Sequence, residues 1–202
     1  MLRWISVAIA LGGLGCAANP SGADSSVERS ADVDADLRAR PHQRGTVIGG
    51  ERVVRAVQWP AAERLDLATR DRLAPAARDA IARAPVPVLA IRDHADTQVF
   101  VGDHWAAATS HGPGWTAHVR ASGQARVYPH VRAVEPTHPV RGGEGFVTRN
   151  EEIWSVAWIE HGVAYAFDLE CDRRIVSWCD DEAAVAKLVD ELVLVGGEGV
   201  SP

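Results

Sequence analysis

The sequence predicts an α+β fold in which an antiparallel β-sheet, arranged as a meander or half-barrel, is packed by one or two helices. The strongest observation is a hairpin over residues 152–171, where two alternating runs meet at His161-Gly162, a dipeptide suited to a two-residue turn. Shorter alternating runs separated by turn residues precede it, and one amphipathic segment with helical spacing follows it. A meander is the economical way to connect such strands.

The register of the hairpin follows if Glu160 faces Val163. One face then carries three large cross-strand pairs: Trp158 with Tyr165, Val156 with Phe167, and Trp154 with Leu169. The other face carries small or polar residues: Ser155, Ala157, Ala164, Ala166, Asp168 and Glu170. We interpret the aromatic face as core, with an apolar ligand groove as the alternative for the same residues.

The remaining elements are predicted from periodicity and turn residues. Residues 46–59 alternate weakly as a strand interrupted by Gly49-Gly50, and residues 75–84 form a helix ended by Pro85. Further strands are predicted at residues 86–91, 98–101, 105–109, 115–121 and 124–128, with a loop over 110–114 and a longer excursion over 129–145. After the hairpin, Asp180 or Asp181 caps a helix that Gly196-Gly197 stops; its apolar stripe is Val185, Leu188, Val189 and Leu192.

Composition narrows the function classes. The chain has 202 residues, 47% of them hydrophobic, which is enough for one domain with a sizeable core. Its formal net charge is -6, so no broad positive field exists to attract nucleic acid, and we expect no nucleic-acid partner. Lys187 is the only lysine, and the arginines are scattered among acids as on a solvated mixed surface.

The N-terminus indicates export. Residues 1–16 have a basic start at Arg3, a short apolar run and then Gly15-Cys16, as in a secretion signal; the run is too short to span a bilayer. Small residues before a cysteine resemble the lipobox of bacterial lipoproteins, although Gly13 stands where that family usually has leucine. The resemblance implies that Cys16 is lipidated and anchors the chain to the membrane; the alternative is cleavage beside Ala17 or Ala18 and free secretion.

The resemblance also implies a location and an order of segments. Ala17 after the cysteine resembles the pattern of outer-membrane lipoproteins, so we expect a lipid-anchored domain on the periplasmic face. Residues 17–45 are rich in Ser, Asp, Ala, Arg and Pro and predict a flexible tether. Residues 46–197 would then form one α+β domain, followed by a tail over 198–202.

Cysteine counting predicts one disulfide. If Cys16 carries the lipid, Cys171 and Cys179 remain as an even pair in an oxidising compartment. Their spacing fits neither a Cys-x-x-Cys redox pair nor a common zinc motif.

Motifs for catalysis are missing from the sequence, so we expect no enzyme, no metal and no cofactor. His104, His111 and His118 recur every seven residues, but that step sets no common face in strands and loops. Ser110 and His111 are neighbours, which in a strand point to opposite faces, and no Gly-x-Ser-x-Gly elbow occurs. The alternative is a periplasmic hydrolase that uses a metal on the three histidines, or Asp168 and Glu170 as acid and base.

Residues 145–197 resemble a recurrent envelope module. The residues that carry the resemblance are Trp154, Trp158, Glu160, Gly162, Val163, Tyr165, Leu188 and Leu192. They are similar to the final hairpin and helix of uncharacterised bacterial lipoproteins and, more distantly, to the domain of periplasmic sigma-regulator proteins and lipoprotein carriers. The resemblance implies a sheet wrapped against helices with an apolar groove for lipid or peptide. The function that we expect is non-enzymatic binding or envelope sensing. A structural module of a larger envelope complex is a further alternative. The matching residues occupy turn and core positions, so no ligand-binding residue is carried over.

Overall fold

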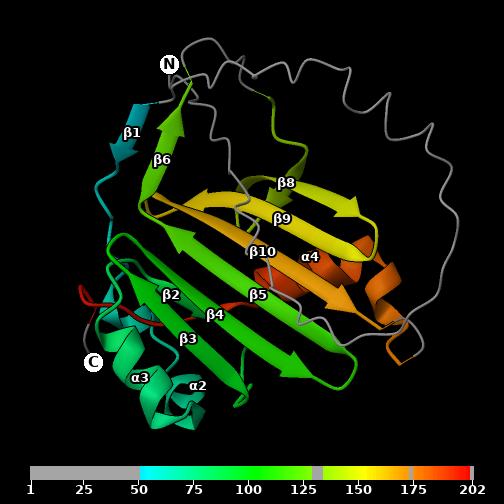
Figure 1. Cartoon of the computed structure of the whole chain (residues 1–202), viewed down its shortest axis with the longest axis horizontal. Coiled ribbons are helices and arrows are strands. Elements are labelled where there is room, and N and C mark those ends of the chain that lie inside the picture. The colour runs from blue at the N-terminus through cyan, green and yellow to red at the C-terminus, as the bar shows by residue number, and fades with distance from the viewer. Residues whose placement is uncertain (1–50, 129–133, 173–174, 201–202) are drawn as a thin grey trace, which may run out of the picture.

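A seven-stranded antiparallel sheet forms the centre of the computed structural model, which describes residues 51–128, 134–172 and 175–200 (Figure 1). Its strand order is β3-β4-β5-β10-β9-β8-β7. The bounds are β3 (Thr97–Gly102), β4 (Trp105–Gly112), β5 (Trp115–Ser122), β7 (His138–Val140), β8 (Gly143–Asn150), β9 (Ile153–Glu160) and β10 (Val163–Cys171). The predicted signal peptide, Cys16 and the tether lie outside the described residues.

The central hairpin has the predicted register. Val163 pairs with Glu160, and the three large cross-strand pairs follow as expected along β9 and β10. His161 and Gly162 both have positive φ, 55° and 75°, as a tight two-residue hairpin turn requires. At Gly162 a Cβ atom would lie 2.6 Å from the carbonyl oxygen of Ala56, so glycine is needed both for its φ and for this close approach.

The sheet is not one meander, because β5 pairs with β10 instead of being followed in the sheet by β6. Two meanders, β3-β4-β5 and β7-β8-β9-β10, therefore meet along the β5–β10 ladder, which we call the seam. After Ser122 and Gly123 the chain leaves the sheet as β6 (Gln124–Val127) and pairs with β1 (Glu51–Val54) in a separate two-stranded ribbon (Figure 1).

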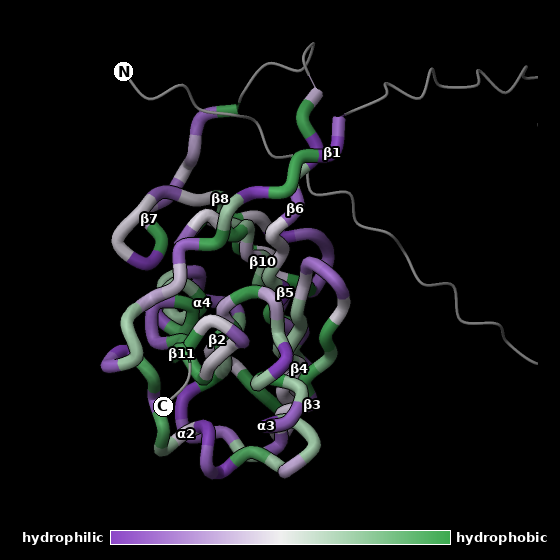
Figure 2. Tube along the Cα trace, turned by 90° about the vertical axis from the view of Figure 1, so that its left-hand side faces the viewer, coloured by the Kyte–Doolittle hydropathy of each residue, from purple (hydrophilic) through white to green (hydrophobic). Residues whose placement is uncertain are grey.

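The smaller elements lie on one side of the large sheet. A second ribbon pairs β2 (Val88–Ala90) with β11 (Val193–Gly196), and it lies with α4 (Glu182–Asp190) behind the sheet (Figure 2). The other helical elements are η1 (Ala62–Arg64), α2 (Leu67–Arg72), α3 (Pro75–Ala82) and η2 (Trp178–Asp180). The described chain is thus mostly antiparallel β-sheet with a few helices, compatible with the α+β class.

The aromatic face of the hairpin is core. Trp154, Trp158, Tyr165 and Phe167 are all buried, and they belong to one hydrophobic cluster with Val185, Val189 and Ile81 of the helices. The polar atoms of these rings are satisfied: Trp154 Nε1 donates to the Cys179 carbonyl, and the Tyr165 hydroxyl donates to the Pro87 carbonyl. These side chains pack against protein, so they do not line an open apolar groove.

Cys171 and Cys179 lie at disulfide distance, with Sγ atoms 1.99 Å apart. The pair joins the end of β10 to η2, immediately before α4. Asp181 is the N-cap of α4, and its side chain accepts a hydrogen bond from the Ala183 amide, as the sequence predicted for one of the two aspartates.

Several boundaries differ from the prediction. The last helix ends at Asp190 instead of at Gly196-Gly197, because the apolar run after it forms β11 against β2. The predicted excursion over 129–145 contains β7 and the start of β8, and the predicted loop over 110–114 gives its first three residues to β4. In the described ranges no helix has the length and apolar character needed to cross a membrane.

Candidate functional site

The open face of the large sheet, opposite the core, carries an ordered grid of side chains. Because side chains alternate along each strand, the face is built from every second residue of β3, β4, β5, β10, β9 and β8. Two adjacent cross-strand rows run across these six strands. The polar row is Gln98, Thr109, His118, Asp168, Ser155 and Thr148; the arginine row is Phe100, Ala107, Arg120, Ala166, Ala157 and Phe146.

The polar row contains two short hydrogen bonds. Thr109 Oγ1 lies 2.6 Å from His118 Nδ1, and Ser155 Oγ donates to Asp168 Oδ1 at 2.6 Å. Burial and then the charge of Arg120 lower the pKa of His118, against the opposing effect of Asp168. The neutral imidazole can accept a hydrogen bond from the Thr109 hydroxyl at Nδ1, so each side chain of these two pairs has a partner.

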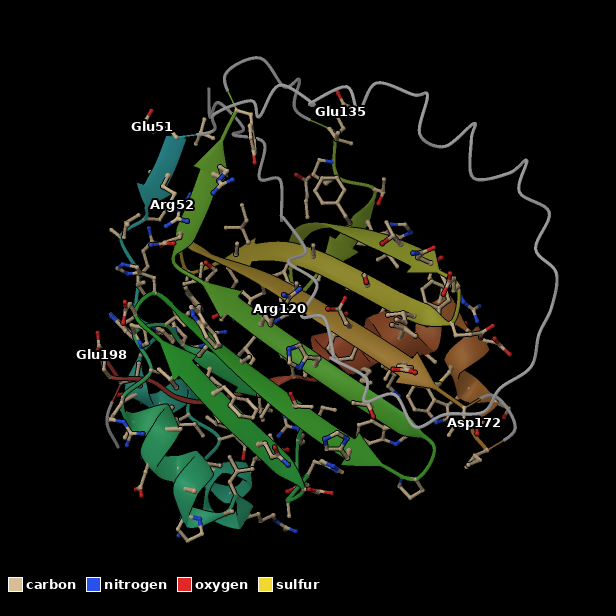
Figure 3. All side chains as sticks on the ribbon, in the orientation of Figure 1. Glu51, Arg52, Arg120, Glu135, Asp172 and Glu198 are labelled. Atoms are coloured by element: carbon tan, nitrogen blue, oxygen red, sulfur yellow. A yellow bond between two sulfur atoms is a disulfide. The ribbon has the colours of Figure 1, made fainter. Side chains whose placement is uncertain are left out.

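The arginine row is different, because Arg120 has little to bind. Its Nε is buried and has no hydrogen-bond partner in the described parts of the chain, and its Nη2 lies 3.7 Å from Asp168 Oδ2, beyond hydrogen-bond distance. Ala107 and Ala166 occupy the paired positions on both sides, and Figure 3 places Arg120 near the middle of the sheet. Small neighbours leave the guanidinium accessible from the open face, with 35% of the side chain exposed.

Apolar side chains surround this arginine at a distance on the same face. Phe100, Trp105, Ile153 and Ile159 are each at least 40% exposed, although all four belong to strands. The open face therefore combines a central arginine whose Nε lacks an acceptor with several exposed large apolar residues. Arginine and exposed apolar residues on one face are typical of interaction sites.

A second candidate site is a cavity of about 320 Å³ where the β9–β10 turn meets α2, β2 and the connection from α4 to β11. We call it the charged cavity. Its lining residues are Arg64, Leu65, Asp66, Leu89, Arg92, Arg141, Glu160, His161, Asp190, Leu192, Val193 and Leu194.

Glu160 and Arg141 form the innermost ion pair of the charged cavity. Arg141 Nε donates to Glu160 Oε2 at 2.8 Å, and the two side chains are 10% and 17% exposed. Burial raises the pKa of Glu160, but the hydrogen bond and charge of Arg141, together with Trp158 and His161, outweigh it and hold the pKa below its ordinary value. Glu160 is therefore ionised at neutral pH.

Arg141 also ties three segments together. Its Nη1 donates to the carbonyl oxygens of Val189 and Leu192, at 3.0 and 2.8 Å, and its amide donates to Asp190 Oδ1. These contacts cap the carbonyl end of α4 with a cation. Arg141 adopts φ +50°, which turns the chain between β7 and β8.

The histidines considered as metal ligands do not converge. His104 precedes β4 and His111 lies near its other end, while His118 is on β5 beside Thr109. In the residues that the structure describes, no group of three or more His, Cys, Asp or Glu side chains could hold a metal ion.

The two other candidate catalytic pairs are Ser110 with His111 and Asp168 with Glu170. Ser110 is buried and bonds Thr97, whereas His111 is exposed on the open face, so the two form no nucleophile and base pair. Asp168 and Glu170 share the open face, but Asp168 is engaged by Ser155 and Arg120. Cys16 lies outside the described residues.

The sequence analysis missed both candidate sites. The position of Arg120 on a polar strand face could have been predicted from the sequence. Polar residues alternate along β5 at Thr116, His118, Arg120 and Ser122. The contacts of Arg141 could not have been predicted, because its partners lie 19 or more residues away and the local sequence predicted only a loop.

No protein-family model, curated protein or solved structure matches this chain at a significant level.

Proposed function

We propose that this chain is a lipid-tethered, non-enzymatic binding module of the bacterial cell envelope, and that its open face docks a protein partner which presents a carboxylate to Arg120. The observation that carries the proposal is the guanidinium of Arg120, which has a buried Nε without an acceptor. A half-barrel-like sheet then serves as the platform, and the anchor at Cys16 holds it on the periplasmic face of the outer membrane.

A carboxylate is the occupant that the charges favour. A buried donor without an acceptor is unfavourable, and a carboxylate accepts two parallel hydrogen bonds from a guanidinium. Asp168 is too far to do so at 3.7 Å and already accepts from Ser155. An anionic group placed over the alanine-flanked arginine would supply acceptors to the exposed part of its side chain.

A protein fits this face better than a small molecule. Small-molecule sites are concave, whereas the two rows extend over six strands of a sheet, roughly 24 Å at the usual strand spacing. Arginine and aromatic residues are enriched at protein interfaces, where a central arginine often carries much of the binding energy. Trp105 on the adjacent strand β4 and Phe100 on β3, one strand further away, supply exposed rings on the same face as Arg120.

Site-specific photo-crosslinking in the native envelope tests the docking face. A photoreactive residue at Phe100 should give a discrete protein adduct, and Arg120→Gln should reduce that adduct roughly tenfold or more, because an interfacial charge pair is lost. Arg83→Gln, an exposed arginine that follows α3, is the matched control and should leave the adduct unchanged.

Two outcomes would overturn the docking proposal: no adduct from the open face, or an adduct equally strong in the Arg120→Gln protein. A decisive supporting result is charge reversal. Arg120→Glu should abolish the adduct, and replacing the crosslinked partner's carboxylate with arginine should restore it.

The tether is tested by the intact mass of the full chain expressed in a bacterial host with lipoprotein processing. The lipobox-like residues before Cys16 support an acyl mass increment on a mature chain that begins at Cys16. Cys16→Ser should remove the increment and release the protein from the membrane fraction. A wild-type chain that begins at Ala17 or Ala18 without lipid would contradict the anchor.

A further inference from the structure

We infer that the charged cavity is a second, separate binding site, which takes a small organic oxyanion: a carboxylate or phosphate group on an apolar body. The inference does not use the open face or the tether. It rests on the hydrogen-bond inventory of the cavity, on the position of its three arginines and on its apolar residues.

The carboxylates of the charged cavity already accept hydrogen bonds from the protein. Asp66 accepts from the Thr69 amide and from Arg92, and Asp190 accepts from the Arg141 amide. Glu160 Oε2 accepts from Arg141 and Trp158, and Oε1 lies 3.7 Å from Arg64. Each of the three acids therefore already has a partner within the protein.

The arginines, by contrast, keep donors in excess. Each guanidinium has five N–H groups. Arg92 uses Nη1 for Asp66, and Arg64 uses Nη1 for His161. The hydrogen bonds of Arg141 within the described chain use its backbone amide, Nε and Nη1, and none of them involves Nη2. The cavity therefore needs acceptors more than donors, which is the chemistry of an oxyanion.

Two of these arginines are exposed at the mouth of the cavity. The side chains of Arg64 and Arg92 are 56% and 58% exposed, and both line the cavity from segments that flank Asp66 in space. Arg141 is nearly buried behind them and is fixed by the α4 carbonyls. One nearly buried and two exposed guanidinium groups around one cavity suit the capture of a single acidic group.

The cavity also has an apolar part. Leu65, Leu89 and Leu194 line it beside the charged groups, and Leu65 and Leu194 form a bridge between their backbones. The three arginines and three carboxylates of the lining cancel in formal charge, so a ligand of low charge with an apolar body fits better than a polyanion.

The test is calorimetric titration of the purified full chain with benzoate, phenyl phosphate, inorganic phosphate and benzyl alcohol. We expect saturable binding of benzoate or phenyl phosphate, weaker binding of inorganic phosphate and none of the alcohol. The first two probes distinguish a carboxylate from a phosphate source. Arg64→Gln and Arg92→Gln should each weaken binding roughly tenfold or more, since each removes a charged donor.

Arg72→Gln is the matched control, because Arg72 is 60% exposed, pairs with the exposed Asp93 and does not line the cavity. It should bind like the wild type, and so should Arg120→Gln, which separates this inference from the docking proposal. Absence of saturable binding up to about 10 mM, or equal affinity of the wild type and both cavity variants, would overturn the inference. Equal binding of inorganic phosphate and phenyl phosphate would overturn the role given to the leucines. Affinity should also fall as salt is raised, because the contact is between charges.

Discussion

At the scale of single residues, Glu160 connects several side chains of the charged cavity. It sits at the end of β9, where it receives Arg141 and Trp158 on one oxygen while His161 and Arg64 lie near the other. The sequence predicted only its place in the hairpin register. Its two arginine partners, Arg141 and Arg64, come from segments that are distant in sequence, and alternation within β9 carries no information about them.

The ionisation of Glu160 should contribute to the pH dependence of the free energy of unfolding. The folded-state pKa of Glu160 is lower than its ordinary value of 4.5, so ionised Glu160 stabilises the fold above about pH 4.5, and this contribution is lost as the pH falls through the folded-state pKa. Urea midpoints measured from pH 7 to pH 3 should fall for the wild type and change less in Glu160→Gln. At pH 7 the variant should be about 3 kcal/mol less stable, because Arg141 is left buried without its counter-charge.

Glu144→Gln provides the control for this measurement, since Glu144 is exposed on β8. It should reproduce the wild-type pH profile. If Glu160→Gln retained the full acid-induced loss of stability, another carboxylate would be responsible for it.

At the scale of elements, local patterns predicted those strands and helices whose periodicity is clear. The β9–β10 hairpin, its turn and the N-cap of α4 were all predicted, because each is fixed by residues close together in sequence. The apolar run of β11 was assigned to the preceding helix, because a short apolar run is compatible with both structures. Its pairing with β2 decides the outcome, and that partner is about a hundred residues away.

The disulfide is the element-scale feature with the most direct stability test. Cys171 and Cys179 are eight residues apart and fasten β10 to η2. The chain-entropy estimate for so short a loop is about 2.5 kcal/mol. The double variant Cys171→Ser with Cys179→Ser should lose about this much free energy of unfolding, measured by urea denaturation.

A reducing agent supplies the check on that interpretation. It should lower the urea midpoint of the wild type toward that of the double variant and leave the variant itself unaffected. Equal stability of the two proteins under oxidising conditions would show that the covalent link does not stabilise the fold.

At the scale of the whole molecule, the sequence predicted an antiparallel sheet with a few helices but not the order of its strands. Alternation states which residues of a strand share a face; it does not state which strand lies beside it. β5 was therefore expected to continue into its sequence neighbours, whereas its second partner is β10. The polar and arginine rows depend on this pairing, and for that reason neither row was visible before the structure.

The seam has a consequence for how the chain folds. Its paired residues are roughly forty to sixty positions apart, whereas the two strands of the β9–β10 hairpin are joined by a two-residue turn. Bringing distant strands together costs more loop entropy than closing a hairpin, so we expect each meander to form before the two join. Alternate amides of β10 bond to β9 and to β5, as in any central antiparallel strand.

The order of the two pairing steps can therefore be measured on the amides of β10. In pulse-labelling hydrogen exchange during refolding, the β10 amides that face β9 should become protected earlier than the intervening amides that face β5. Simultaneous protection of both sets would mean that the seam belongs to the folding nucleus. If the meanders form first, Arg120 of β5 and Asp168 of β10 come together only in the last step of folding. A partner that contacts both residues would then bind the folded protein but not its folding intermediates.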